Sequence, residues 1–157
     1  MRNGNSLGKS AEALFSCQLY KYTNWPNPKV PPKPGVYAVW QEEELVWVGS
    51  AGGSLRSRFE KHSKGKRRGS EFLKAVFARL MFSHLGLEKA MKMAGETQLL
   101  IDVITAKFVK EHLSYQYLPT RNEQTAEFIA TAICQGKTPY PQPFLNPSED
   151  DAGLRGS

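Results

Sequence analysis

The sequence lacks the features on which membrane, secreted and zinc-binding proteins depend. No apolar run approaches the roughly 18–20 residues that a membrane-spanning helix needs. Residues 1–10 are polar and lack the apolar core of a secretory signal. The chain has only two cysteines and three histidines, and they do not follow the spacing of a zinc site. These absences argue against a membrane or secreted protein, and we expect a cytoplasmic one.

Several short motifs of familiar enzyme classes are also missing. The glycine-rich stretch Gly49–Ser54 could cradle a phosphate at the start of a helix, but it lacks the Gly-Lys-Ser/Thr of an ATP-binding loop. Cys17 and Cys134 have no motif spacing. A disulfide between them remains an option, although two free and mostly buried thiols fit a cytoplasmic protein better.

The sequence does contain a concentrated basic segment. Its 157 residues suit one domain, and 40% hydrophobic and 23% charged residues are ordinary for a soluble globular protein. The net charge is +6. Between Arg56 and Arg79, nine basic and two acidic residues give +7, which leaves −1 for the rest of the chain. This concentration is typical of a surface that binds phosphate backbones. The alternative is an ordinary solvated helix face.

Two β-branched and aromatic runs predict a hairpin. They are Val36–Trp40 and Leu45–Val48. The Gln-Glu-Glu-Glu segment 41–44 between them is short enough for a hairpin turn. Ser54 then has the right side chain to cap a helix that begins at Leu55.

The rest of the domain combines helices with one more expected strand. Ser70 is expected to cap an amphipathic helix, and Leu87–Met93 to form another short one. The apolar run Thr97–Val109 is the best candidate for a third, central strand. Lys110–Pro119 is ambiguous. The last helix starts at Thr120 or Asn122 and extends to about Cys134.

The N-terminal third is expected to be less regular. Residues 1–12 are expected to be loose, and Ala13–Tyr22 fits either a short helix or a strand. Asn24–Pro34 contains five prolines, which favour an extended chain. We interpret it as a rigid lead-in to the first strand; a ligand for a groove-binding partner is the alternative.

Together these elements predict an α+β domain. It has a small, mainly antiparallel sheet of three strands flanked by helices. Residues 1–33 form an N-terminal extension and 34–147 the domain proper. Within the domain, 64–96 form a basic helical insertion. Residues 148–157 are interpreted as a disordered tail or a cloning remnant.

Phosphodiester hydrolysis is a reaction that such a basic domain could perform. It requires a deprotonated water, neutralised charge on the phosphoryl oxygens and a stabilised leaving oxygen, usually with a metal ion. Mg²⁺ or Mn²⁺ takes oxygen ligands and keeps several waters. One carboxylate can therefore suffice when the substrate phosphate supplies the remaining ligands.

The hairpin and the helix after it resemble the GIY-YIG nuclease family. Gly35-Val36-Tyr37 resembles the first motif of that family, and Trp47-Val48-Gly49 stands where the second belongs. The family has an arginine on the next helix, followed in many members by a histidine one turn later, which Arg58 and His62 match. A glutamate on a later helix and an asparagine near the end of the domain complete the pattern. The matching residues here are Glu127 and Asn146.

The resemblance implies a role for each matching residue. Tyr37 would be the general base or would orient the attacking water. Arg58 would contact the scissile phosphate, and His62 would hydrogen-bond Tyr37 or a phosphate. Glu127 would bind one Mg²⁺ or Mn²⁺ ion, and Asn146 would anchor the site. A phenol has an ordinary pKa near 10, so a general base would need the metal, its water or a nearby cation to lower the pKa.

Each assignment has a rival or a simpler interpretation. Arg56 competes with Arg58, and Glu123, one helical turn earlier, competes with Glu127. Taken alone, Tyr37 is a strand aromatic in the core and His62 a solvated helix residue. Glu127 taken alone is a surface glutamate.

The second motif departs from the family because Trp47 stands where a tyrosine belongs. Indole offers one N–H donor and cannot accept a proton. This leaves proton handling at that position in question, but not the fold. The residues expected to contact DNA are Trp47, Arg56, Lys61, Lys64, Lys66, Arg67 and Arg68.

The first functional hypothesis is a stand-alone, metal-dependent endonuclease that cuts double-stranded DNA. It resembles the compact restriction endonucleases of the family, because the chain has little room for a separate DNA-binding domain. Such an enzyme would cut both strands as a homodimer, although the sequence supports only one active site per chain. The alternatives are a non-catalytic DNA-binding module with a decayed site and a structure-specific repair nuclease.

Overall fold

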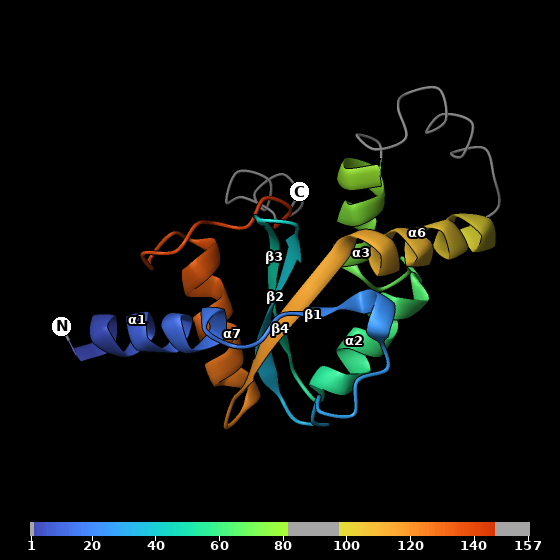
Figure 1. The fold of residues 1–157 in the computed structure, drawn as a ribbon. Coiled ribbons are helices and arrows are strands. Elements are labelled where there is room, and N and C mark those ends of the chain that lie inside the picture. The colour runs from blue at the N-terminus through green and yellow to red at the C-terminus, as the bar shows by residue number, and fades with distance from the viewer. Residues whose placement is uncertain (1, 82–97, 147–157) are drawn as a thin grey trace.

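The computed structural model describes residues 2–81 and 98–146, and all structural statements below concern those residues. They form an antiparallel sheet with helices on both faces, as Figure 1 shows. The sheet order is β1-β4-β2-β3. The strands are β1 (Tyr20–Lys21), β2 (Gly35–Gln41), β3 (Glu44–Ala51) and β4 (Leu113–Pro119). The helices are α1 (Arg2–Phe15), α2 (Leu55–Lys64), α3 (Glu71–Ala75), α6 (Gln98–His112) and α7 (Glu123–Cys134), with the 3₁₀ turn η1 (Tyr22–Asn24) and the π-helical segment η2 (Val76–Met81).

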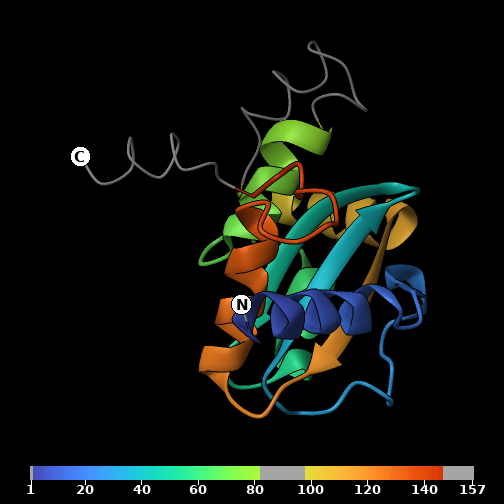
Figure 2. The same ribbon diagram turned by 90° about the vertical axis from the view of Figure 1, so that its left-hand side faces the viewer.

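The alternation of side chains along β2 divides the core into two layers. Val36 and Ala38 belong to the layer under α1 and α7. Tyr37 and Val39 belong to the layer under α2, α3 and α6. Figures 1 and 2 show the two groups of helices on opposite faces of the sheet. Because both faces are covered, β2 needs no polar side, and this explains its almost continuous apolar sequence.

The predicted helix starts and the hairpin are confirmed. Ser54, Ser70 and Asn122 each accept a hydrogen bond from the backbone N–H three residues later, at 3.2, 3.1 and 2.8 Å. These bonds satisfy N–H groups that the first turn of a helix leaves unpaired. Asn122, rather than Thr120, therefore begins the last helix. β2 pairs with β3 through a tight turn in which Glu42 has a positive φ of 55°.

The α+β class is confirmed, but the predicted three strands are wrong, because the sheet has four. The segment Thr97–Val109, expected to be a central strand, lies largely in α6. Its buried residues recur at helical spacing, whereas Leu100 just before them and Val103 between them are exposed. The ambiguous segment before Pro119 supplies β4, which pairs with both β1 and β2. The buried positions of α6 are Ile101, Thr105, Phe108 and Val109.

The prediction that residues 1–12 are loose is also wrong. Residues 2–12 belong to α1, where Ala11 and Leu14 are completely buried. These small and aliphatic side chains pack in the layer under α7, and Phe15 packs against Trp40 with ring centroids 6.0 Å apart. Of the proline-rich segment Asn24–Pro34, Asn24 ends the 3₁₀ turn η1, and residues 25–34 contain no helix or strand.

Some predictions fall outside the described residues. These are the short helix at 87–93, the end of the insertion and the tail from residue 148. The described part of the insertion contains α3 and η2. No helix among the described residues is both long and apolar enough to cross a membrane.

β3 is an edge strand of the sheet, and residues 144–146 cover its outer edge. The backbone N–H groups of Phe144 and Leu145 donate to the carbonyls of Leu45 and Val46, at 3.1 and 2.8 Å. This segment therefore satisfies edge groups that would otherwise remain available to another strand.

Gly65 is expected to be required for α2 to pack against α6. It ends α2 with φ of 67°, and a Cβ there would meet the backbone of Asp102 and Ala106. Gly65→Ala should lower the free energy of unfolding by about 2 kcal/mol or more, from the left-handed backbone and the collision together. Gly69→Ala is the matched control, since Gly69 has φ of 76° but nothing within 4 Å of its Cβ position. Urea unfolding measures both variants. Equal losses would contradict the collision.

Candidate functional site

A small pocket lies where β3 leads into α2. It has a volume of about 210 Å³. Tyr37 from β2, Trp47 from β3, and Arg58 and His62 from α2 all line it. The structure thus brings together four residues that the sequence marked as functional. The other lining residues are Gly49, Ser50, Gly69, Ser70, Glu71 and Phe72.

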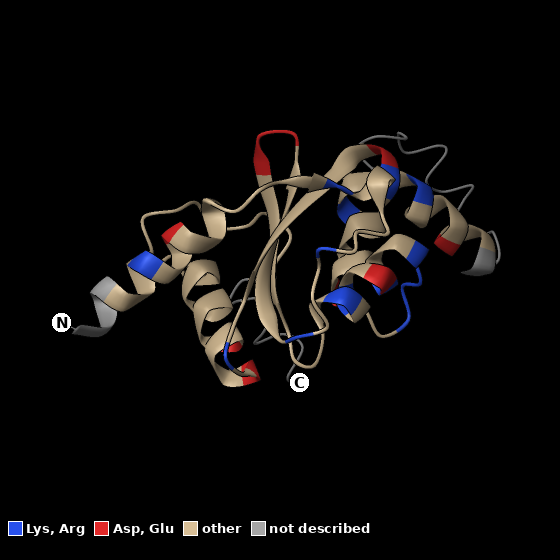
Figure 3. Cartoon of the chain, turned by 60° about the horizontal axis from the view of Figure 1, so that its bottom comes forward, with Lys and Arg blue, Asp and Glu red and all other residues tan. Residues whose placement is uncertain are grey.

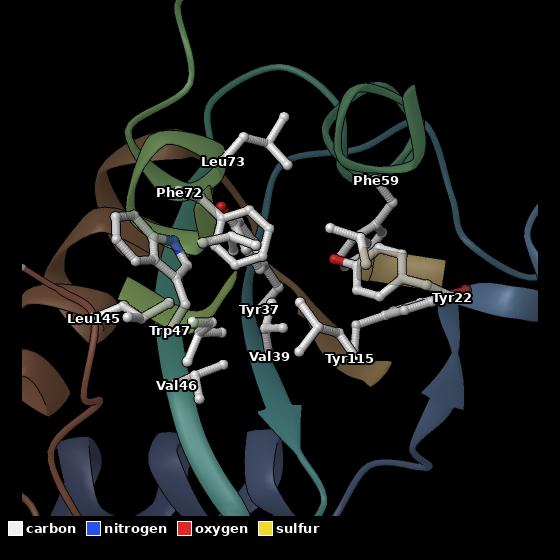
Figure 4. Close-up of a cluster of buried hydrophobic side chains, with 14 of the residues drawn as sticks. Tyr22, Tyr37, Val39, Val46, Trp47, Phe59, Phe72, Leu73, Tyr115 and Leu145 are labelled. Carbon is white, nitrogen blue, oxygen red and sulfur yellow. The ribbon is translucent and has the colours of Figure 1, made fainter. Parts of the chain in front are cut away.

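Gly49 lets two polar groups approach the floor of this pocket. A Cβ at residue 49 would stand 2.6 Å from the hydroxyl oxygen of Tyr37 and 2.9 Å from Nε1 of Trp47. Any larger residue would displace one of them. Figure 4 shows the two aromatic rings rising from neighbouring strands toward α3. A glycine at this position therefore follows from the packing of the site.

Tyr37 is a buried phenol, with 3% of its surface exposed. Burial raises its pKa above the ordinary value of 10; the Arg58 guanidinium and the nearby Trp47 indole partly counteract this effect. Trp47 nevertheless makes no hydrogen bond to the phenol within the described residues. At neutral pH Tyr37 is therefore protonated and can orient a water or an oxyanion. It would act as a base only if a bound cation lowered its pKa further.

His62 is buried rather than solvated, with 1% of its surface exposed. Its Nδ1 is 2.8 Å from the hydroxyl of Tyr22, and its ring packs against Phe72 with centroids 4.3 Å apart. Burial, and then the charge of Arg58, hold the His62 pKa well below its usual range. The imidazole is therefore neutral at pH 7. Its hydrogen-bond partner Tyr22, 40 residues earlier, was not foreseen from the sequence.

The neutral state of His62 predicts how stability depends on pH. In the unfolded chain the imidazole takes a proton below about pH 6.5, whereas in the folded chain it resists protonation until a lower pH. The unfolded state then binds more protons, so the stability should fall as the pH drops below about 6.5, by up to roughly 1.4 kcal/mol per unit. Urea unfolding between pH 7.5 and about 5 measures this slope.

The matched variants identify the source of the slope. His62→Gln should flatten it, while His112→Gln, on α6, should leave most of it. A slope that survives in His62→Gln would show that another group is responsible.

Asn146 attaches the C-terminal segment to β3. Its side-chain amide bonds both backbone groups of Val48, accepting from the N–H at 2.9 Å and donating to the carbonyl at 2.8 Å. Val48 lies next to Trp47, and its side chain points to the opposite face of the sheet. Asn146 therefore holds the strand that carries Trp47, as an anchor would, and it does not line the pocket itself.

Glu127 lies on the exposed surface of α7, outside the lining of the pocket. One turn earlier, Glu123 packs against Gly52, just after β3. Two turns later, the thiol of Cys134 points at the carbonyl of Val48, 3.7 Å away. Residues 123, 127 and 134 share one side of the helix, so Glu127 lies between these contacts in an exposed position. α7 packs on the face of the sheet opposite to Tyr37 and Trp47, and the structure therefore does not bring Glu127 into the pocket.

This position fits a metal held by one protein carboxylate. The described residues contain no group of three or more His, Cys, Asp or Glu side chains that could hold a metal ion. An exposed Glu127 leaves room for the waters and phosphate oxygens that Mg²⁺ or Mn²⁺ would need. A second carboxylate, Glu71, lines the pocket from the first turn of α3. Its position could not be predicted from the sequence, because nothing in the local pattern links Glu71 to Tyr37.

The predicted DNA-binding cations have different surroundings. Arg56 donates from Nε to the carbonyl of Val30 at 2.9 Å. Arg67 forms an ion pair with Asp102 at 3.0 Å, and Lys64 one with Glu60 at 3.6 Å. Lys61, Lys66 and Arg68 are exposed.

Two further lysines join this basic surface. Lys107 and Lys110 from α6 line an open groove of about 1300 Å³ together with Lys64, Lys66 and Arg68. The same groove is also lined by Glu60, Asp102 and Glu111, which offset part of this positive charge. Figure 3 shows basic residues over α2 and α6. The sequence did not point to these lysines, because Lys107 lay in the segment expected to be a strand and Lys110 in the segment left ambiguous. A second small pocket, of about 240 Å³, lies at the start of α2 and shares Arg58 with the first.

The chain matches no family model, no curated protein and no solved structure. The similarity to GIY-YIG nucleases therefore rests on the residues of the two motifs and on the positions that follow them.

Proposed function

We propose that the protein is a divalent-metal-dependent endonuclease that hydrolyses phosphodiester bonds in double-stranded DNA. One observation carries the proposal: Tyr37, Arg58 and His62, which resemble the family pattern in the sequence, line one pocket. Tyr37 and His62 also pack against each other and around Phe59 in the core, so the proposal depends on Arg58 joining them at a pocket that opens to solvent. The basic surface of α2 and α6 beside them suits a phosphate backbone.

Each residue then has a physical task in the reaction. Arg58 neutralises charge that develops on the phosphoryl oxygens. Tyr37 orients the attacking water, and neutral His62, fixed by Tyr22, keeps the floor of the pocket rigid without adding a competing charge. Glu127 would hold the Mg²⁺ or Mn²⁺ ion, which when bound supplies a more acidic water and stabilises the leaving oxygen. Asn146 keeps β3 in place.

Restriction-type cleavage is the form that we favour. DNA specificity would come from the N-terminal residues 1–33 and the insertion 64–96, because they are the main additions to the core. Cutting both strands would require a homodimer on DNA, with one site per chain. Branched and linear duplex substrates separate this enzyme from a structure-specific repair nuclease.

A plasmid assay tests the proposal. Wild-type protein should nick or linearise supercoiled DNA with Mg²⁺ or Mn²⁺, and Tyr37→Phe should lower the rate by roughly 100-fold, because the variant keeps the ring but loses the hydroxyl. Tyr140→Phe is the matched control, since Tyr140 packs against Phe15 on the other face of the sheet. If wild type cuts no faster than Tyr37→Phe, the enzyme proposal fails.

A non-catalytic DNA-binding module is the second candidate. The raised pKa of Tyr37 favours it, because a protonated phenol cannot accept a proton. This candidate predicts binding that weakens steeply with salt and no cleavage with any metal. Nicking that appears only after Trp47→Tyr would indicate a decayed site.

A further inference from the structure

Trp47 differs from the other two tryptophans in its hydrogen bonding. The indole N–H of Trp25 donates to Glu60 at 2.6 Å, and that of Trp40 donates to Gln116 at 2.7 Å. The N–H of Trp47 is buried and lies near the Tyr37 hydroxyl, close enough to influence the pKa of that phenol, but it makes no hydrogen bond of acceptable geometry among the described residues. Only 8% of the residue is exposed. Buried donors in native proteins are nearly always bonded, so an exception requires an explanation.

The surroundings of this N–H supply one. Nε1 stands over Gly49 beside the hydroxyl of Tyr37, and Trp47 lines the same pocket as Arg58. In Figure 4 the indole nitrogen lies on the side of the ring that faces Tyr37. An acceptor seated in the pocket would lie next to this N–H. Because the nitrogen itself is buried, the lining side chains must shift for the bond to form.

The pocket favours an acceptor that is anionic and carries several oxygens. Indole donates only and stays neutral, and Arg58 adds a positive charge beside it. Ser50 and Ser70 contribute hydroxyls. Glu71 is the acidic residue of the lining, and its carboxylate lies 3.6 Å from the ammonium of Lys74, which reduces its repulsion of an anion. A phosphate group meets these requirements, and a neutral acceptor would not use the guanidinium.

We propose that Trp47 is an oxyanion-binding residue, whose indole N–H donates to a non-bridging oxygen of a phosphodiester held in this pocket by Arg58. The choice of a DNA phosphodiester as the ligand rests on the proposed function. The observation that the indole N–H of Trp47 lacks a hydrogen bond is independent of it. Trp47 then contributes to binding the substrate, and the replacement of tyrosine by tryptophan is compatible with an active site.

The indole N–H signals in a ¹H–¹⁵N NMR spectrum test the proposal on the wild-type protein. Trp47→Phe assigns the signal of Trp47, and Trp25 and Trp40 serve as internal controls because their N–H groups are already bonded. Two probes are added separately without divalent metal: a short DNA duplex and inorganic phosphate. We expect the Trp47 signal to move downfield with the duplex while the other two stay nearly fixed.

The outcomes separate this proposal from the nuclease proposal. A shift of Trp47 with either probe supports the oxyanion donor, even if the protein never cuts DNA. A shift with phosphate alone supports the donor and removes DNA as its ligand. If neither probe moves the Trp47 signal, the proposal is overturned, even if DNA moves backbone signals of α2.

A binding comparison adds a second readout. Trp47→Phe should weaken binding of the duplex by about tenfold, as expected for losing one hydrogen bond to a charged group. Trp40→Phe, an equal loss of size on the other face of the sheet, should leave affinity within about twofold. Far-UV circular dichroism confirms that each variant is folded. Equal affinities for the two variants would contradict the proposal.

Discussion

Replacing Arg58 with alanine is expected to lower the rate of DNA cleavage by roughly 10²–10³-fold, the range typical for removal of one group that stabilises charge in a transition state. Arg58 lines both small pockets at the start of α2, and its charge acts on Tyr37 as well as His62. Its loss therefore removes a phosphate contact and also the cation that favours ionisation of Tyr37. Single-turnover cleavage with saturating protein measures the rate without the effect on binding.

Arg56→Ala is the matched comparison for this variant. It removes the same charge from the same helix, but Arg56 donates to the carbonyl of Val30 and lines neither small pocket. We expect weaker DNA binding and a single-turnover rate within about tenfold of wild type. If the single-turnover cleavage rate falls equally in both alanine variants, Arg58 contributes only through the overall positive charge of α2.

Glu127→Gln is expected to reduce cleavage by at least about 100-fold, because a bound metal contributes several kcal/mol to the transition state. The amide keeps the size of the side chain and removes its charge. Raising the concentration of Mn²⁺ should restore part of this activity, whereas it should not rescue Arg58→Ala. The measurement is the dependence of the single-turnover rate on metal concentration.

Glu123→Gln decides between the two candidate ligands. Glu123 packs against Gly52, so its replacement should alter the loop before α2 and lower the rate by about tenfold or less. A loss in Glu123→Gln that exceeds the loss in Glu127→Gln, together with rescue by metal, would transfer the role to Glu123.

Local signals in the sequence were sufficient for the part of the fold that carries the pocket. The caps at Ser54, Ser70 and Asn122 act within three residues, so their effect can be read from a short window. The hairpin also depends on neighbouring residues. For the same reason the spacing of Arg58 and His62 on one helix predicted that both would face the same way.

The errors arose where distant packing decides the conformation. The β-branched residues of Thr97–Val109 favour a strand, but their burial against α2 and the sheet requires a helix. Short windows also missed Tyr22 and Glu71, because each reaches the site from an element whose position only the folded chain determines. Glu127 matched the family position in the sequence, and Glu123 remained its rival because it lies one helical turn earlier on the same helix.

Because residues 144–146 cover the edge of β3, this edge stays unpaired on the ribosome until these residues have been synthesised. Val48 and Asn146 are 98 residues apart, so a ribosome needs roughly 5–20 seconds to make the segment between them. During that time β3 is an apolar strand with an open edge, which could pair with the same strand of another nascent chain. The three glutamates at its turn, Glu42–Glu44, place like charges at the tip of each hairpin. Their repulsion opposes such pairing until Phe144–Asn146 arrive to close the edge.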